Sequence, residues 1–147
     1  MVNPSIKLLY VEDEDVMRSI VMRMFAGNSA IDAMAVRRAS DAIELMEKED
    51  FDIIILDWWL QDPDTMEIRT SEEILNWMNS HNYFALTVVF TSTDIDEKVT
   101  NGVAVIRKDL RDMLRRKIEE VVDQKKTAVE ALDMIRKTLN RMTIGVR

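Results

Sequence analysis

Short apolar runs alternate with segments of helical periodicity along most of this chain, and this alternation constrains its fold more than any other feature. The runs are short and rich in β-branched and large aliphatic residues, as strands are. Five of them are predicted to be strands, at residues 6–11, 33–36, 51–56, 86–90 and 103–106. Strands separated by helices predict a parallel sheet with helices on both faces. Right-handed crossovers then limit the topology to a doubly wound α/β domain.

Two connections in this pattern are expected to be irregular. The residues after position 57 are rich in Asp, Thr and Gln and predict a loop of about a dozen residues. Thr70 or Ser71 is then expected to cap the next helix, with Glu73 just inside its first turn. Residues 91–101 are polar and have room for little more than about two helical turns.

The last part of the chain is predicted to be one long helix. Residues 108–142 contain no Gly or Pro. A helix of about 34 residues would be roughly 50 Å long. Apolar residues recur along it at alternating spacings of three and four, which is a heptad stripe broken by one lysine. The stripe comprises Ile118, Val121, Lys125, Ala128, Leu132, Ile135, Leu139 and Met142.

The body of the domain can cover only the first half of such a helix. We therefore divide the chain into a domain at residues 1–120 and a helical extension at residues 121–147. The part of the apolar stripe that the domain leaves uncovered must pack against another surface. We expect that surface to be the same helix of a second copy, in a parallel or antiparallel homodimer. Its expected contact residues are Ile118, Val121, Leu132, Ile135 and Leu139. Two alternatives stay open: the helix docks on its own domain, or it continues into an output domain.

Polar side chains follow four of the five predicted strands. They are Glu12 and Asp13 after the first strand, Asp57 after the third, Thr91 and Ser92 after the fourth, and Lys108 after the fifth. The carboxyl ends of parallel strands meet at one edge of the sheet, where such folds form their sites. Three carboxylates, a hydroxyl and an ammonium are therefore expected to converge on one crevice.

Three carboxylates in one crevice require a cation. Two carboxylates ~5 Å apart repel by roughly 3 kcal/mol at an effective dielectric constant near 20. A site with only oxygen ligands, and without His or Cys, favours Mg²⁺ or, as a second option, Mn²⁺. The cation would screen Asp57 as it attacks a phosphorus atom. Lys108 and the Thr91 hydroxyl are placed to bind the phosphoryl oxygens.

Composition excludes several classes of function. The chain has no Cys, so disulfides, thiol catalysis and Cys-based metal sites are ruled out. No apolar run approaches the ~18 residues of a spanning helix, and the first residues lack a signal-peptide pattern. We therefore expect a cytoplasmic protein without membrane contact. Residues 1–107 hold 9 Lys/Arg against 20 Asp/Glu, which argues against direct nucleic-acid binding by this part.

In its residues and their order, the chain resembles the response-regulator receiver domains of two-component signalling. The resemblance covers roughly residues 5–120. It rests on the ordered set LLYVEDE (8–14), ASDAIEL (39–45), FDIIILD (51–57), VVFTS (88–92) and VAVIRK (103–108). It implies a flavodoxin-like (βα)5 fold, here with an extended C-terminal helix. It also implies a signalling domain that accepts phosphate from a sensor histidine kinase or phosphotransfer protein, with only self-phosphorylation and self-dephosphorylation as activities.

The resemblance assigns a role to each strand-end residue. Asp57 would be the phosphoacceptor and a metal ligand. The other assignments are Glu12 and Asp13 as the acidic pair for the metal, the backbone carbonyl of Trp59 as a further ligand, Thr91 as the switch hydroxyl, Ser92 as the small residue whose N–H faces the phosphate, and Lys108 as the family's lysine.

Several departures from the family pattern leave other functions open. The stretch after the acceptor is longer than usual and has no Gly, and the segment before the fifth strand is short enough to predict a stunted helix. Val105 stands where many members have an aromatic switch residue, and Asp109 replaces the proline that commonly follows the lysine. The first alternative is therefore a pseudo-receiver, which is not phosphorylated and acts as a dimerisation or docking module. The second is an aspartate-nucleophile phosphatase of the haloacid dehalogenase type, although such enzymes need an Asp where Trp59 stands.

Overall fold

The structure is a computed structural model that describes residues 5–145. Its elements follow the predicted order, with an added pair of strands after β3 and without a helix between the last two strands. They are β1 (Ile6–Val11), α1 (Asp15–Ala26), β2 (Ile31–Val36), α2 (Ala39–Lys48), β3 (Ile53–Leu56), β4 (Trp59–Gln61), β5 (Ile68–Thr70), α3 (Glu72–Ser80), β6 (Leu86–Thr91), β7 (Ala104–Arg107), a short 3₁₀ turn (Lys108–Leu110) and α4 (Arg111–Gly145).

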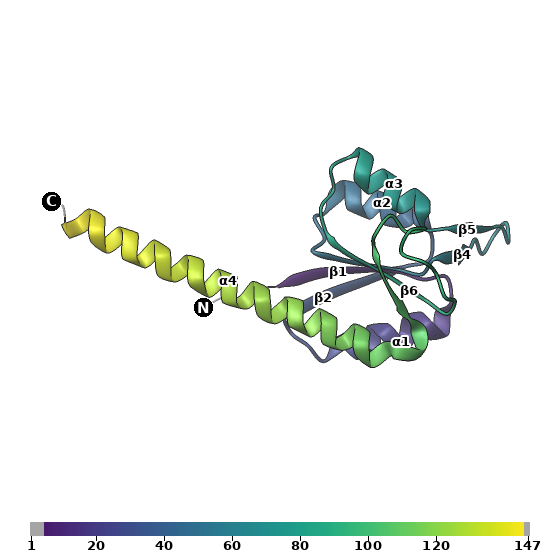
Figure 1. Ribbon diagram of the computed structural model, residues 1–147, viewed down its shortest axis with the longest axis horizontal. Helices are drawn as coiled ribbons and strands as arrows, with labels where there is room; N and C mark the ends of the chain where they lie inside the picture. The colour runs from purple at the N-terminus through teal and green to yellow at the C-terminus, as the bar shows by residue number, and fades with distance from the viewer. Residues whose placement is uncertain (1–4, 146–147) are drawn as a thin grey trace.

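Five parallel strands form one sheet in the order β2-β1-β3-β6-β7 (Figure 1). α1 and the first part of α4 cover one face of the sheet, and α2 and α3 cover the other. This confirms the doubly wound α/β fold and gives it the flavodoxin-like strand order. The carboxyl ends of β1 and β3 lie side by side in the middle of the sheet and open on the crevice where such folds bind ligands.

β1 and β3 are buried on both faces because nearly all their residues are apolar. Successive side chains of β1 point to opposite faces of the sheet. Leu8 and Tyr10 therefore pack on the side of α1 and α4, whereas Leu9 and Val11 pack on the side of α2 and α3. Two fully enclosed strands thus fix the positions of the residues that follow them.

The segment after β3 is a β-hairpin, where the sequence indicates a loop. Leu60 of β4 packs into the core with α2 and α3 and anchors the hairpin on the domain. Near the tip, the Asp62 side chain accepts hydrogen bonds from the backbone N–H groups of Asp64 and Thr65 at 2.8 and 3.1 Å. Strands of three residues offer too little alternation for the sequence pattern to reveal them.

The connection between β6 and β7 contains no helix, so the expected stunted helix is absent from this described segment. Residues 97–102 form turns instead. The buried Thr100 hydroxyl donates to the Val103 carbonyl at 2.8 Å, and Asn101 and Gly102 have φ values of 55° and 82°. Side chains that bond to the local backbone compete with helix formation, and left-handed residues end a helix.

α4 packs on the sheet only through its first half. Ile118 and Val122 are buried in the core formed with α1 and the strands. Lys125 is the point at which the helix leaves the domain. Its ammonium donates to the Ser5 carbonyl at 3.1 Å and lies 3.4 Å from the Asp52 carboxylate.

Beyond Lys125 the helix extends away from the domain (Figure 1). Leu132 and Ile135 are 62% and 55% exposed there. Ile118 is fully buried in the core of its own domain, so it cannot serve as the expected dimer contact, and Val121 is partly buried beside it. Despite the length of α4, neither it nor another helix within residues 5–145 has an apolar stretch sufficient to cross a membrane.

Candidate functional site

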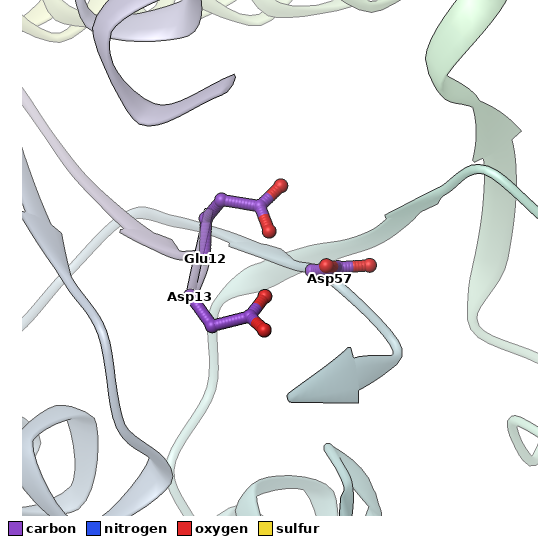
Figure 2. Close-up of side chains that lie close together, drawn as sticks. All are labelled: Glu12, Asp13 and Asp57. Atoms are coloured by element: carbon purple, nitrogen blue, oxygen red, sulfur yellow. The ribbon is translucent and has the colours of Figure 1, made fainter. Parts of the chain in front are cut away.

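Three acidic side chains meet at the carboxyl ends of the two central strands. Glu12 and Asp13 directly follow β1, and Asp57 directly follows β3. Each offers a carboxylate oxygen within 4.8 Å of the others (Figure 2). Glu12 and Asp57 are buried, and Asp13 is partly exposed at the mouth of the crevice. The structure therefore brings together the carboxylates that the strand ends predict.

Lys108 completes this cluster from the end of β7. Its ammonium lies 2.6 Å from Glu12 Oε1 and 3.1 Å from Asp57 Oδ2. Only 10% of its side chain is exposed. The ammonium thus joins two buried carboxylates that would otherwise face each other without a cation.

The crevice still carries more negative than positive charge. Burial and the neighbouring Asp57 carboxylate raise the pKa of Glu12 from its ordinary value of 4.5 to about 8, although Lys108 opposes the rise. Burial by itself lowers the pKa of Lys108, but the ion pairs with Glu12 and Asp57 outweigh this effect and raise it. Three oxygen donors with an unbalanced negative charge fit a hard divalent cation such as Mg²⁺.

Tyr10 contributes a hydroxyl to this crevice that the sequence analysis missed. Its side chain is fully buried, and its Oη lies 2.8 Å from Glu12 Oε1. Burial, followed by the charge of Glu12, raises the pKa of Tyr10 above its ordinary value. The sequence does contain a signal for this residue. Tyr10 stands in a mostly aliphatic strand, two residues before an acid and on the same face.

The β4–β5 hairpin is joined to the crevice through its backbone. The Gln61 N–H donates to Asp13 Oδ2 at 3.0 Å. Backbone hydrogen bonds flank the paired strands on either side: the Ser71 N–H donates to the Trp58 carbonyl, and the Asp62 N–H donates to the Glu67 carbonyl. Because hydrogen-bonded and non-bonded pairs alternate, the backbone groups of Trp59 face the same edge as the Gln61 N–H. The carbonyl of Trp59 is therefore directed toward the acidic side of the hairpin.

The two adjacent tryptophans have different environments. Trp58 is buried, whereas Trp59 is 47% exposed beside the crevice. The β4–β5 pairing explains the difference, because successive side chains of a strand point in opposite directions.

Two further residues, missed from the sequence, hold the backbone of the crevice. Ser71 is the N-cap residue of α3, as expected, but its buried hydroxyl donates to the Asp57 carbonyl and makes no cap hydrogen bond. The Arg18 guanidinium, on α1, donates to the carbonyls of Glu12 and Asp13 at 2.9 and 3.3 Å. Neither contact has a local sequence signal, because each joins a side chain to a backbone group in another element.

The predicted phosphoryl-binding residues of β6 lie at the same edge of the sheet. Thr91 is the last residue of β6 and is fully buried, and its hydroxyl is 3.4 Å from Thr93 Oγ1. Ser92 follows it and is exposed. Val105 lies on β7 and is half-buried, so this strand position has no aromatic ring.

The family model described as the response regulator receiver domain matches residues 8–118 of this chain. A search of curated proteins finds no match. The family match therefore covers every strand-end residue discussed above and stops within the first half of α4.

Several solved structures share the fold at low sequence identity. The signal receiver domain of a protein named as a LuxO repressor, from Vibrio parahaemolyticus, is 20% identical with a TM-score of 0.69, covering 83% of this chain and 93% of that one. A CheY-like receiver domain protein from Methanospirillum hungatei is 19% identical with a TM-score of 0.67, covering 84% and 98%. A fusion carrying a yeast Spc42 trimeric coiled coil is 16% identical with a TM-score of 0.66 and covers 100% of both chains.

Proposed function

Because the chain belongs to the response regulator receiver domain family, we propose that it signals by accepting a phosphoryl group on Asp57. The phosphodonor is a sensor histidine kinase or a phosphotransfer protein. One observation supports this above the others: the buried Asp57 carboxylate faces the Lys108 ammonium at 3.1 Å, beside two further acids. A carboxylate held in this way at the end of a central strand is positioned as a nucleophile.

The acidic cluster would hold the metal ion that this chemistry requires. Glu12, Asp13 and Asp57 supply carboxylate oxygens, and the backbone carbonyl of Trp59 is directed to the same side. When bound, Mg²⁺ supplies positive charge that offsets the carboxylates and the phosphoryl oxygens. Mn²⁺ is the second option because it accepts the same oxygen ligands.

The chain's own groups would carry the transfer. An Asp57 carboxylate oxygen attacks the phosphorus of a phosphohistidine, a P–O bond forms, and the P–N bond to the imidazole breaks as the imidazole takes up a proton. The Lys108 ammonium, the Thr91 hydroxyl and the Ser92 N–H bind the phosphoryl oxygens and stabilise their charge. Water later hydrolyses the acyl phosphate and restores Asp57.

The exposed half of α4 is proposed to bind a second copy of the chain. Leu132 and Ile135 expose more than half of their surface on a helix that has left its own domain. Since Lys125 is bound to the domain edge, the shared surface begins after it.

A pseudo-receiver that is not phosphorylated is the second candidate. The missing helix between β6 and β7 and the absence of an aromatic ring at Val105 favour it, because both belong to the region that usually responds to phosphorylation in the family. In this case the extension of α4 alone would provide the function, as a dimerisation or docking element.

Incubation with acetyl phosphate and Mg²⁺, followed by intact-mass measurement, separates the two candidates. The wild-type chain should gain one phosphoryl group, and Asp57→Asn should gain none. Asp64→Asn, which changes an exposed carboxylate at the hairpin tip, is the matched control and should be labelled like the wild type. Equal labelling of wild type and Asp57→Asn, or none in either, would contradict the proposed function.

A further inference from the structure

Tyr10 is the one polar side chain within the aliphatic stretch of β1 that is directed at the site. Its side chain is fully buried in the core between the sheet and the α1–α4 layer. Only its hydroxyl reaches the crevice, where it donates to Glu12 Oε1 at 2.8 Å. Because the ring is enclosed and the strand is central, the hydroxyl has a fixed position.

The same oxygen of Glu12 is also bound by the lysine. Lys108 Nζ lies 2.6 Å from Oε1, so this oxygen has two donors on the core side of the carboxylate. The other oxygen, Oε2, has the backbone N–H of Glu14 at 3.4 Å, a long contact. The two donors therefore hold Oε1 and leave Oε2 as the oxygen with capacity for a further ligand.

We propose that Tyr10 is a positioning residue for metal binding: its hydroxyl holds Glu12 Oε1 in the core, so that Oε2 is presented to a divalent cation between Glu12, Asp13 and Asp57. This inference rests on the proposed function, because it concerns the same acidic cluster. Hydrogen bonds to a ligating carboxylate fix its orientation, and their removal typically costs roughly 10–100-fold in metal affinity. Lys108 cannot replace Tyr10 in this role, because its ammonium also pairs with Asp57 and is placed to bind the phosphoryl group.

The chain contains a matched control for the test. It has two tyrosines, and the second, Tyr83, lies away from the crevice. Its hydroxyl accepts from the Phe51 N–H at 2.6 Å and donates to the Glu49 carbonyl at 2.7 Å. Tyr10→Phe and Tyr83→Phe each remove one bonded hydroxyl and add no atoms. They differ in whether that hydroxyl contacts Glu12.

Mg²⁺ affinity of the full chain, measured by isothermal titration calorimetry, is the primary readout. Tyr10→Phe should bind Mg²⁺ about tenfold or more weakly than the wild type, and Tyr83→Phe should bind within twofold of it. Thermal unfolding of both variants checks that the fold is retained. The same comparison in a Glu12→Ala background isolates the contact, because Tyr10→Phe should have no further effect once position 12 has no acceptor oxygen.

Equal Mg²⁺ affinity of Tyr10→Phe and wild type would overturn the inference while leaving the proposed function in place. A loss that persists undiminished in the Glu12→Ala background would also overturn it, because the tyrosine would then act through packing. A wild-type chain that binds no Mg²⁺ at millimolar concentration would overturn the proposed function and the inference together.

Discussion

Replacing Lys108 with Met is expected to destabilise the metal-free protein by about 3–5 kcal/mol at pH 7. The ammonium contacts Glu12 and Asp57 in a buried crevice at 2.6 and 3.1 Å. The raised pKa of Glu12, about 8, keeps this carboxyl mostly protonated at pH 7 with or without the lysine. The loss therefore comes from the Asp57 carboxylate, which is left buried without its cation, and removing one partner of a buried ion pair costs about 3–5 kcal/mol.

Urea unfolding in EDTA, followed by tryptophan fluorescence, measures this loss. Arg107→Met is the matched control because Arg107 pairs with Asp94 and Asp109 at 3.3 and 3.2 Å on the surface. Pairs exposed to that extent contribute less than about 1 kcal/mol. Mg²⁺ should return part of the stability lost in Lys108→Met, since a cation present at about 100 times its Kd adds roughly 2.7 kcal/mol.

The pH dependence provides a second check on the same variant. A carboxyl whose pKa is raised on folding contributes stability below its ordinary pKa, and this stability is lost as the pH rises through the raised value. For Glu12 the window runs from 4.5 to about 8 in the wild type. Removing Lys108 raises this pKa further, because the lysine opposes the rise, so Lys108→Met should lose more stability at pH 9 than at pH 7. A loss at pH 7 no larger than that of Arg107→Met, or an equal loss at both pH values, would refute the reasoning.

Three further outcomes are expected. Ile135→Lys should lower the mass of the assembled chain in light scattering, because it places a charge in the heptad stripe. Met134→Lys, which changes an exposed residue outside the stripe, should not, and equal masses of the two variants would argue against a helix–helix contact through Ile135. Ile118→Ala should lower the free energy of unfolding by about 2–5 kcal/mol, because the side chain is fully buried, and a loss below 1 kcal/mol by urea unfolding would contradict its place in the core. Ser71→Ala should cost about 1–3 kcal/mol in the same assay, because it leaves the Asp57 carbonyl without its buried donor, and a neutral effect would contradict that contact.

The sequence predicted the sheet because the sheet depends on patterns that are local. The apolar run at residues 6–11 is β1 to the residue, and the run at 51–56 contains β3. The ends of these two strands then placed the three acids, two after β1 and one after β3, since the last apolar residue marks where the chain leaves the sheet. The sequence alone therefore located all three acids, Glu12, Asp13 and Asp57, at the carboxyl edge of the sheet.

The contacts that organise the site could not be predicted in this way. The Ser71 hydroxyl is a helix cap by its sequence pattern, yet it bonds to the Asp57 carbonyl, 14 residues earlier in the chain. The Gln61 N–H reaches Asp13 only because the hairpin folds back over the crevice. Ile118 belongs to the same heptad stripe as Leu132, and only the length of the domain decides which of them is covered. Each outcome depends on the three-dimensional packing of distant segments, which periodicity does not encode.

The β4–β5 hairpin is hydrogen-bonded to two of the acidic residues. It reaches Asp13 through the Gln61 N–H at 3.0 Å, and the Ser71 contacts with Trp58 and Asp57 join its base to the acceptor strand. A cation bound by Asp13 would change the charge beside the Gln61 hydrogen bond, and a phosphoryl group on Asp57 would change the charge beside the Ser71 hydrogen bond. The half-exposed Trp59 lies between Trp58 and Gln61 in the sequence, so its fluorescence is expected to respond to events in the crevice. In a chain with no aromatic ring at Val105 and no helix in the described segment before β7, the hairpin offers a covalent and hydrogen-bonded connection between Asp57 and the exposed Trp59.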